Sequence, residues 1–394
     1  MMGKRFKAML LLLIFCLPGG LAAAQNQDSK RGDKMFLNGA DISMLTKVEE
    51  NGGKFKLNGE VKDFFEIMKS YGMNSYRLRL FVKPNYEGGV VNDLPYTIQL
   101  AKRIKAAGMV FILDFHYSDT WADPQHQIKP EDWEGLDFPA LTQKVEDYTS
   151  EVIATCKDNG VLPEIVQIGN EIRAGMIWPE GRVGNAGDDQ TVQWNQLTEL
   201  IKAGIRGVHG AVGGGDQVKI MIHTDQGANR GHTKWFFDNL HQHDIDYDII
   251  GLSYYPWWHG TMQELRDNLI ATANDYGKPI IVAEAAYPYF DMDNWWQENR
   301  GDTLEYPLTV DGQRQFLADV ICALEAIPND LGLGILYWYP EAVPVGELEV
   351  WNNGHTALFD LDFNALSSMS AFQKQPSISA GSWHFFHLKS FPIM

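Results

Sequence analysis

Two glutamates that end short apolar runs are the residues best suited to chemistry in this sequence. Glu171 closes the segment EIVQIGNE at positions 164–171, and Glu284 closes IIVAE at 280–284. The β-branched residues of both runs predict buried strands, whose carboxyl ends form the ligand-binding face of an α/β fold. Two carboxylates that converge on one bond are what glycoside hydrolysis requires, and a retaining enzyme holds them about 5 to 5.5 Å apart.

The two acids would need different environments for that reaction. A proton donor needs a raised pKa, whereas a nucleophile must stay ionised. If Arg79 lies beside Glu284, its charge would keep Glu284 ionised, and Glu171 would be the protonated partner. Asn170 could donate a hydrogen bond to a sugar 2-hydroxyl. A single acid at a strand end would more simply cap the next segment, so this hypothesis depends on the pair.

Eight short apolar runs alternate with helical patterns along the chain. The expected strands lie at residues 35–44, 73–82, 110–116, 164–171, 218–223, 249–255, 280–284 and 334–338. Strands that alternate with helices pair in parallel, and eight such units in about 330 residues fit a closed barrel. We therefore predict an α/β fold with a single (β/α)8 TIM barrel, in which the fourth and seventh strands face each other.

A polar or aromatic side chain stands at the carboxyl end of every expected strand. The set comprises Asp41, Arg79, His116, Glu171, His223, Tyr255, Glu284 and Trp338. Any one of them could be a hydrogen-bonded core group. Burying eight polar or amphipathic groups at corresponding positions lowers the stability of the fold, however, so we expect such a set only where it serves a function. This pattern indicates a substrate-binding ring at the mouth of the barrel.

Tryptophans gather in the same region. Nine of the twelve lie at expected strand ends or in the loops that follow, including Trp121, Trp338 and Trp351. Indole faces stack on the apolar faces of sugars, while polar groups at the rim bind the hydroxyls. A single tryptophan could equally pack beneath a long loop. The group as a whole favours a carbohydrate cleft.

Composition narrows the choice of partner. The chain carries 33 Lys and Arg against 51 Asp and Glu, a net charge of −18. The negative charge repels polyanions, so we expect a neutral polysaccharide as substrate and no nucleic acid as partner. The glycine run 213–215 lacks the spacing of a phosphate-binding loop, and Cys156 and Cys322 have no metal-site or disulfide spacing. We expect no redox or organic cofactor.

The first 24 residues have the pattern of a signal peptide. Lys4, Arg5 and Lys7 precede an apolar run that is too short to span a membrane, and small residues end at Ala24. We predict export, to a secreted, periplasmic or cell-surface location. Cys16 offers a lipid anchor as the alternative. The catalytic domain would occupy residues 25–375 as a monomer, and we assign no role to the tail 376–394.

Five motifs resemble one known family. They are GADIS at 39–43, FHYSDTWADP at 115–124, QIGNE at 167–171, GLSYYP at 251–256 and YWYP at 337–340. Over about residues 35–372 the chain resembles the endo-β-1,4-galactanases of glycoside hydrolase family 53. The resemblance implies a retaining (β/α)8 hydrolase with Glu171 as acid/base, Glu284 as nucleophile and β-1,4-galactan of type I arabinogalactan as substrate.

The resemblance leaves three questions open. Some bacterial relatives hold a structural calcium ion, and Asp291, Asp293 and Asn294 are candidate ligands here, although a solvated acidic loop has the same composition. Another retaining β-glycanase, such as a mannanase or cellulase, is the alternative within the enzyme class. A catalytically silent glycan-binding barrel is the alternative outside it.

Overall fold

A computed structural model describes residues 35–185, 187, 189–213 and 217–373, apart from the side chain of Asp293. The expected signal peptide, its Cys16 alternative and the tail 376–394 lie outside the described residues, as do both ends of the expected catalytic domain. Those expectations stay predictions. Within the described ranges, no helix combines the length and apolar character needed to cross a membrane.

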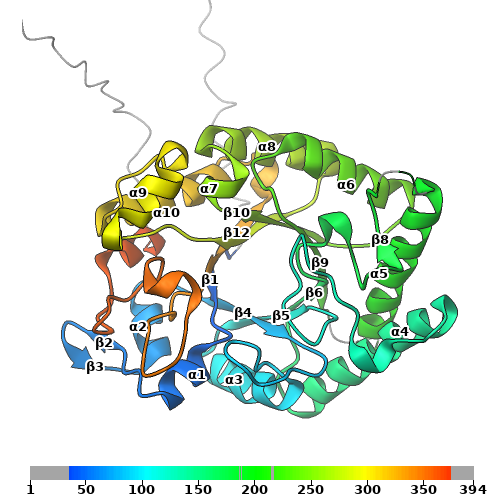
Figure 1. Cartoon of the computed structure of the whole chain (residues 1–394), viewed down its shortest axis with the longest axis horizontal. Helices are drawn as coiled ribbons and strands as arrows, with labels where there is room; N and C mark the ends of the chain where they lie inside the picture. Colours follow the sequence, from blue (N-terminus) through cyan, green and yellow to red (C-terminus); the bar gives the residue numbers. More distant parts are fainter. Residues whose placement is uncertain (1–34, 186, 188, 214–216, 374–394) are drawn as a thin grey trace, which may run out of the picture. The chain divides into compact units, whose positions relative to one another are not determined.

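Eight parallel strands close into a barrel (Figure 1). In chain order they are β1 (Leu37–Asp41), β4 (Ser75–Leu80), β5 (Val110–Phe115), β6 (Ile165–Ile168), β9 (Lys219–Thr224), β10 (Ile249–Tyr254), β11 (Ile280–Ala285) and β12 (Gly332–Trp338). Strand β1 pairs with both β4 and β12, which closes the ring. The predicted (β/α)8 barrel is therefore confirmed, with all eight strands at their predicted places.

Seven of the helices in the described residues surround the strands (Figure 1). They are α2 (Phe64–Ser70), α3 (Leu94–Ala106), α4 (Phe138–Asp158), α5 (Gln190–Val212), α6 (Arg230–Gln242), α8 (Met262–Tyr276) and α10 (Val310–Glu325). Each starts at an Asp, Asn or Thr whose side chain accepts a hydrogen bond from a backbone amide of the first turn. Such caps satisfy amides that have no partner within the helix.

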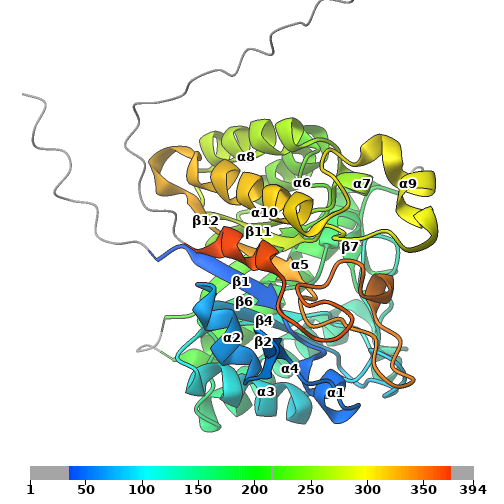
Figure 2. The same ribbon diagram turned by 90° about the vertical axis from the view of Figure 1, so that its left-hand side faces the viewer.

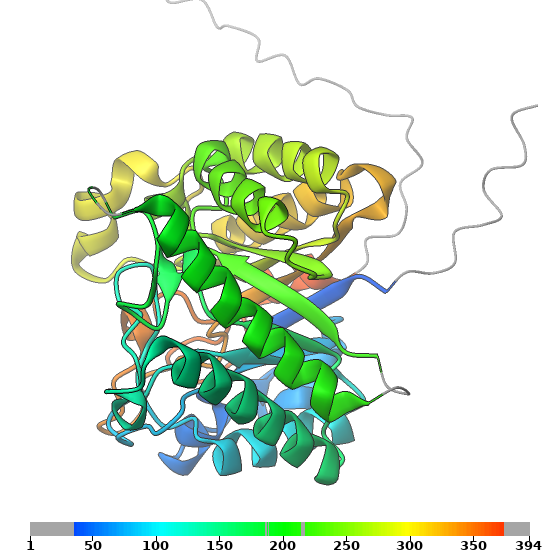
Figure 3. The same ribbon diagram turned by 90° about the vertical axis from the view of Figure 1, so that its right-hand side faces the viewer.

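The neighbouring helices α4 and α5 pack side by side along one flank (Figure 3). Gly207 of α5 allows this approach, because a Cβ at that position would lie 2.5 Å from the carbonyl oxygen of Glu146 and 2.7 Å from Cβ of Thr149. A larger side chain at position 207 would therefore force the two helices apart.

The barrel interior is divided into an apolar half and a polar half. Side chains near the amino ends of the strands form a separate apolar cluster of Leu37, Ile112, Ile165, Met221, Ile249, Ile281, Ala283 and Leu336. Above it, towards the carboxyl ends, the buried side chains are largely polar and include Asp41, Arg77, Asp114, Gln167, His223 and Glu284. The lower half supplies the close-packed core, and the upper half carries the polar residues predicted at the strand ends.

The remaining short elements lie mostly in the loops after the strands. Apart from short 3-10 helices, they are α1 (Leu45–Glu50), α7 (Pro256–His259), α9 (Trp295–Arg300), and two small hairpins, β2 (Lys56–Leu57) with β3 (Glu60–Val61) and β7 (Gly175–Met176) with β8 (Gly181–Arg182). Figure 2 shows α7, α9 and β7 on the side towards which β1 points, together with the loop that follows β12. These segments build the walls of the carboxyl face of the barrel.

Candidate active site

Glu171 leaves the end of β6 in an unusual backbone conformation. Gly169 has φ +79°, and a Cβ there would lie 2.6 Å from the side chain of Ile172. Two residues later Glu171 itself is left-handed, with φ 49° and ψ 45°. For a residue with a Cβ this conformation costs about 1 kcal/mol, and such strain is concentrated at functional sites. The turn aims the Glu171 side chain across the mouth of the barrel.

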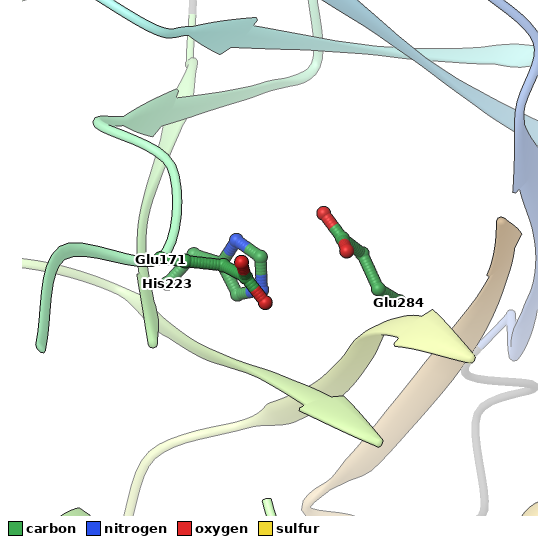
Figure 4. A group of neighbouring side chains, drawn as sticks. All are labelled: Glu171, His223 and Glu284. Atoms are coloured by element: carbon green, nitrogen blue, oxygen red, sulfur yellow. The ribbon is translucent and has the colours of Figure 1, made fainter. Parts of the chain in front are cut away.

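Glu284 lies on the opposite side of that mouth, on β11. Figure 4 shows the two carboxylates pointing towards each other, with the His223 ring beside Glu171. A carboxylate oxygen of Glu171 and one of Glu284 lie within 4.8 Å of each other. Both side chains are nearly buried, with 8% and 4% exposed. Two residues that are 113 positions apart in the chain therefore share one site.

Arg77 holds the Glu284 carboxylate. Its Nη2 donates to Oε1 of Glu284 at 2.7 Å, and its Nε donates to Oδ2 of Asp41 at 2.9 Å. The expectation that Arg79 would lie beside Glu284 is wrong. Both arginines point into the barrel from β4, but Arg79 lies one layer higher and its guanidinium stacks 4.2 Å from the centre of the Trp121 ring.

A second donor fixes the other oxygen of Glu284. The Tyr255 hydroxyl donates to Oε2 of Glu284 at 2.9 Å. Arg77 and Tyr255 together hold the carboxylate in one orientation and favour its charged form, because both donate hydrogen bonds to it. No cation pairs directly with Glu171 among the described residues.

These environments separate the two acids in pKa. Burial, then the charges of Glu284 and Asp225, raise the pKa of Glu171 well above its ordinary value. Burial also raises the pKa of Glu284, but the charge and hydrogen bond of Arg77 oppose that rise, so it is the smaller of the two. A single proton in this pair therefore resides on Glu171, and Glu284 carries the charge.

The two glutamates line a cleft of about 770 Å³. Seven of the residues predicted for the site line it: Trp121, Asn170, Glu171, Tyr255, Glu284, Trp338 and Trp351. The Trp338 ring lies edge-on to both Trp121 and Trp351, at centroid distances of 6.3 and 6.4 Å. Four tryptophans and a comparable number of carboxylates line this cleft, and a cavity of this size that combines aromatic faces with hydrogen-bonding groups fits an organic ligand such as a sugar chain.

The other four predicted residues lie beneath the cleft rather than in its wall: Asp41, Arg79, His116 and His223. The Nδ1 of His116 accepts a hydrogen bond from the amide of Ala122, next to Trp121. The Nδ1 of His223 lies 3.0 Å from Oδ1 of Asn170, and its Nε2 lies 2.9 Å from the Ser253 hydroxyl. These side chains support the residues that form the cleft.

Several functional neighbours were not among the predicted site residues. Gln167 accepts from Arg77 at 3.0 Å and donates to Oδ1 of Asp114 at 2.7 Å, which links β4, β5 and β6 beneath the acids. Arg173 and Asp225 form an ion pair of 2.7 Å at the edge of the cleft. Alternation along β4 and β5 puts Arg77 on the same face as Arg79 and Asp114 on the same face as His116, but only the folded barrel brings them to Glu284.

Two groups of residues can be tested as metal sites. Glu171, His223 and Glu284 are close enough to share an ion. However, both oxygens of Glu284 and both nitrogens of His223 already have hydrogen-bond partners, and Arg77 supplies a positive charge, so the trio fits proton transfer better than cation binding. In the candidate calcium loop, both oxygens of Asp291 accept amide hydrogen bonds from α9. Calcium binding there stays a prediction.

Comparison with known proteins identifies the family. The model of "Glycosyl hydrolase family 53" matches residues 37–372. The chain belongs to glycoside hydrolase family 53. Among curated relatives, the "Endo-beta-1,4-galactanase" of Bacillus subtilis is 34% identical over 89% of this chain and 80% of its own length. The "Arabinogalactan endo-beta-1,4-galactanase A" of Aspergillus niger is 35% identical over 77% of this chain and 84% of its own.

Solved structures agree with this family assignment. The family 53 catalytic domain of Ignisphaera aggregans has a TM-score of 0.78 at 34% identity, covering 86% of this chain and 95% of that one. A fungal β-1,4-galactanase structure has a TM-score of 0.73 at 31% identity, covering 86% and 99%. A family 10 xylanase with 13% identity shares the fold at a TM-score of 0.57. As a family 53 member, the protein is a glycosyl hydrolase.

Proposed function

We propose that this family 53 enzyme is an endo-acting β-1,4-galactanase that cleaves galactan with retention of configuration. The observation that carries the proposal is the pair of facing carboxylates, of which only Glu284 is held by an arginine. An inverting enzyme holds its carboxyls about 6.5 to 9.5 Å apart, because a water molecule must fit between the general base and the sugar. The shorter distance between Glu171 and Glu284 favours direct attack by a carboxylate instead. Glu284 is then the nucleophile and Glu171 the acid/base.

In the first step, a carboxylate oxygen of Glu284 attacks the anomeric carbon of the sugar. The bond between that carbon and the glycosidic oxygen breaks as Glu171 gives its proton to the leaving oxygen, and a glycosyl ester on Glu284 results. Arg77 and Tyr255 hold the attacking carboxylate in place throughout. The raised pKa of Glu171 favours its protonated form, which supplies the required proton.

In the second step, water releases the sugar from Glu284. Glu171, now a carboxylate, takes a proton from the water, whose oxygen attacks the anomeric carbon and displaces the Glu284 carboxylate. The product keeps the β configuration because two inversions occur at the same carbon. The enzyme returns to its starting protonation state, so the cycle needs no redox or organic cofactor.

The substrate assignment is supported by the named relatives. The two curated galactanases cited above and the fungal structure are each described as acting on β-1,4-galactan or arabinogalactan. The cleft itself supports a neutral chain, because four tryptophans line it and its acidic residues outnumber its one arginine. None of the relatives cited above is named as a mannanase or a cellulase. The family 10 xylanase shares only the fold with this chain, so it does not support a different substrate.

We also propose that the enzyme is exported and acts as a monomer. Export is supported by the signal-peptide pattern of residues 1–24. Action as a monomer stays a prediction from the sequence.

Product analysis tests the proposed function. Purified enzyme would be incubated with potato β-1,4-galactan, mannan and carboxymethylcellulose, and the products sized over time. The proposal predicts galacto-oligosaccharides of mixed length from the first substrate, with β anomers formed first in the NMR spectrum. Galactose as the only product, α anomers first, or activity confined to mannan or carboxymethylcellulose would contradict it.

A further inference from the structure

A second hollow opens beside the catalytic cleft. It has a volume of about 530 Å³ and shares Pro124, Gln125 and Arg173 with the cleft, so the two adjoin each other. Its further wall comes from the β7–β8 hairpin region and from helix α6. We call it the Trp235 groove and define it by Arg173, Trp178, Arg182, His232 and Trp235.

Two indoles give this groove its character. Trp235 projects from α6 with 37% of its surface exposed, and its ring packs edge-on against Trp194 at 5.1 Å. Trp178 is half-buried, and the Arg182 guanidinium lies 4.3 Å from the centre of its ring. An exposed indole that is held in place by a second ring loses little freedom when it stacks on a sugar.

Two of the three ionisable groups that define the groove, Arg173 and His232, present no uncompensated charge to a ligand. The Arg173 guanidinium is paired with the buried Asp225 at 2.7 Å, so its charge is compensated. Burial and the charge of Arg173 lower the pKa of His232, which leaves its ring neutral at neutral pH. A neutral imidazole and an exposed guanidinium can both bind sugar hydroxyls.

The groove lies on the Glu171 side of the active site. Arg173, Trp178 and Arg182 all follow Glu171 within eleven residues of the same loop. Trp338, Trp351 and the nucleophile Glu284 belong instead to β11, β12 and the loop after β12. In the proposed reaction Glu171 protonates the leaving oxygen, which belongs to the part of the chain that departs.

We propose that the Trp235 groove binds the leaving-group end of the galactan chain, with a galactosyl ring stacked on Trp235. This assignment rests on the proposed function and extends it to the part of the substrate beyond the scissile bond. Binding energy gained there favours cleavage of long chains over short ones, because only a long chain reaches both the acids and the groove.

A Trp235→Ala variant tests the proposal with two substrates. β-1,4-Galactohexaose labelled at its reducing end can fill the groove, whereas nitrophenyl β-1,4-galactotrioside, cleaved at the nitrophenyl bond, cannot. We expect kcat/KM to fall about tenfold for the hexaose and to stay unchanged for the nitrophenyl substrate. The labelled product should become shorter, because cleavage no longer gains from sugars beyond the acids.

Two further variants make the test specific. Trp235→Phe keeps an aromatic face and should recover most of the lost rate on the hexaose. Trp295→Ala removes a half-exposed indole that lines neither hollow, and it should leave the hexaose rate and the cleavage position unchanged. Melting temperatures of all three variants establish that they are folded.

The outcomes separate this proposal from the proposed function. A wild-type enzyme that does not cleave galactohexaose would contradict both. An active wild type beside a Trp235→Ala variant with unchanged hexaose kinetics, or with equal losses on both substrates, would contradict the groove assignment alone. A shift towards longer labelled products would place the non-reducing end in the groove and would also contradict it.

Discussion

Nη2 of Arg77 lies 2.7 Å from Oε1 of Glu284, and the facing Glu171 has no such partner among the described residues. This asymmetry gives two chemically identical side chains different roles. The carboxylate beside the cation keeps its charge, and the buried carboxyl opposite keeps its proton.

Replacing Arg77 should change the pH dependence of the enzyme. In Arg77→Lys a single ammonium cannot reproduce the contacts to Asp41, Gln167 and Glu284, so the pKa of Glu284 should rise. Since Glu284 must be ionised to attack, the acidic limb of the kcat/KM profile should move to higher pH, and kcat should fall about a hundredfold.

Arg79→Lys is the matched control for that experiment. Arg79 supports Trp121 and does not contact Glu284. Its replacement should weaken substrate binding and leave the acidic limb in place. A limb that moves in Arg79→Lys and not in Arg77→Lys would contradict the structure.

Tyr255→Phe removes only the hydroxyl that donates to Oε2 of Glu284. A hydrogen bond to a charged group contributes about 1.5 to 3 kcal/mol, so kcat should fall roughly 10- to 100-fold. The ring that lines the cleft remains, so KM should change little. Steady-state kinetics on galactan measure both quantities, and a raised KM with unchanged kcat would show that Tyr255 acts only as a binding surface.

Glu171→Ala should affect substrates according to their leaving group. A natural galactosyl leaving group needs the proton of Glu171, whereas a dinitrophenolate departs without one. We expect galactan cleavage to fall by at least 10³-fold, within the range of general acid catalysis of about 10² to 10⁴. Ester formation from a dinitrophenyl galactoside should persist, and azide should restore turnover by entering the space of the lost carboxylate. Equal losses on both substrates would contradict the assigned role.

Glu341 should make the fold less stable at high pH. Burial raises the pKa of Glu341 to about 8. Its Oε1 accepts a hydrogen bond from the Met44 amide, whereas its Oε2 has no hydrogen-bond partner in the described part of the chain. The folded state therefore holds a proton that the unfolded state loses above about pH 4.5, so stability falls as the pH rises from about 4.5 to 8. Glu341→Gln should raise the melting temperature more at pH 9 than at pH 5. The exposed Glu325→Gln should show no such difference.

The proposed export predicts where the mature chain begins. Cleavage after Ala24 would give a first residue of Gln25, which mass spectrometry of protein secreted by a host with a general export pathway can detect. A lipid-modified chain that starts at Cys16 would instead support the membrane-anchored alternative.

The sequence predicted the barrel because each strand has a short β-branched run and each helix an amphipathic repeat with a capping residue. It predicted Glu171 and Glu284 because strand ends meet at one face. It pointed to Arg79 instead of Arg77, which lies on the same face of β4, because the partner of Glu284 depends on the relative heights of β4 and β11 in the barrel. It also could not identify Trp235, because a tryptophan on an outer helix has the same pattern whether it faces a groove or solvent.

The identity of the nucleophile is the most direct test of the account. A galactobioside with fluorine at C2 and a dinitrophenyl leaving group would glycosylate the nucleophile quickly, with loss of dinitrophenolate, and would be hydrolysed from it slowly, so peptide mapping would locate the added mass. The proposed mechanism predicts one label per chain, attached to Glu284 and absent from the Glu284→Gln variant. A label on another residue, or no ester on an enzyme that cleaves galactan, would contradict it.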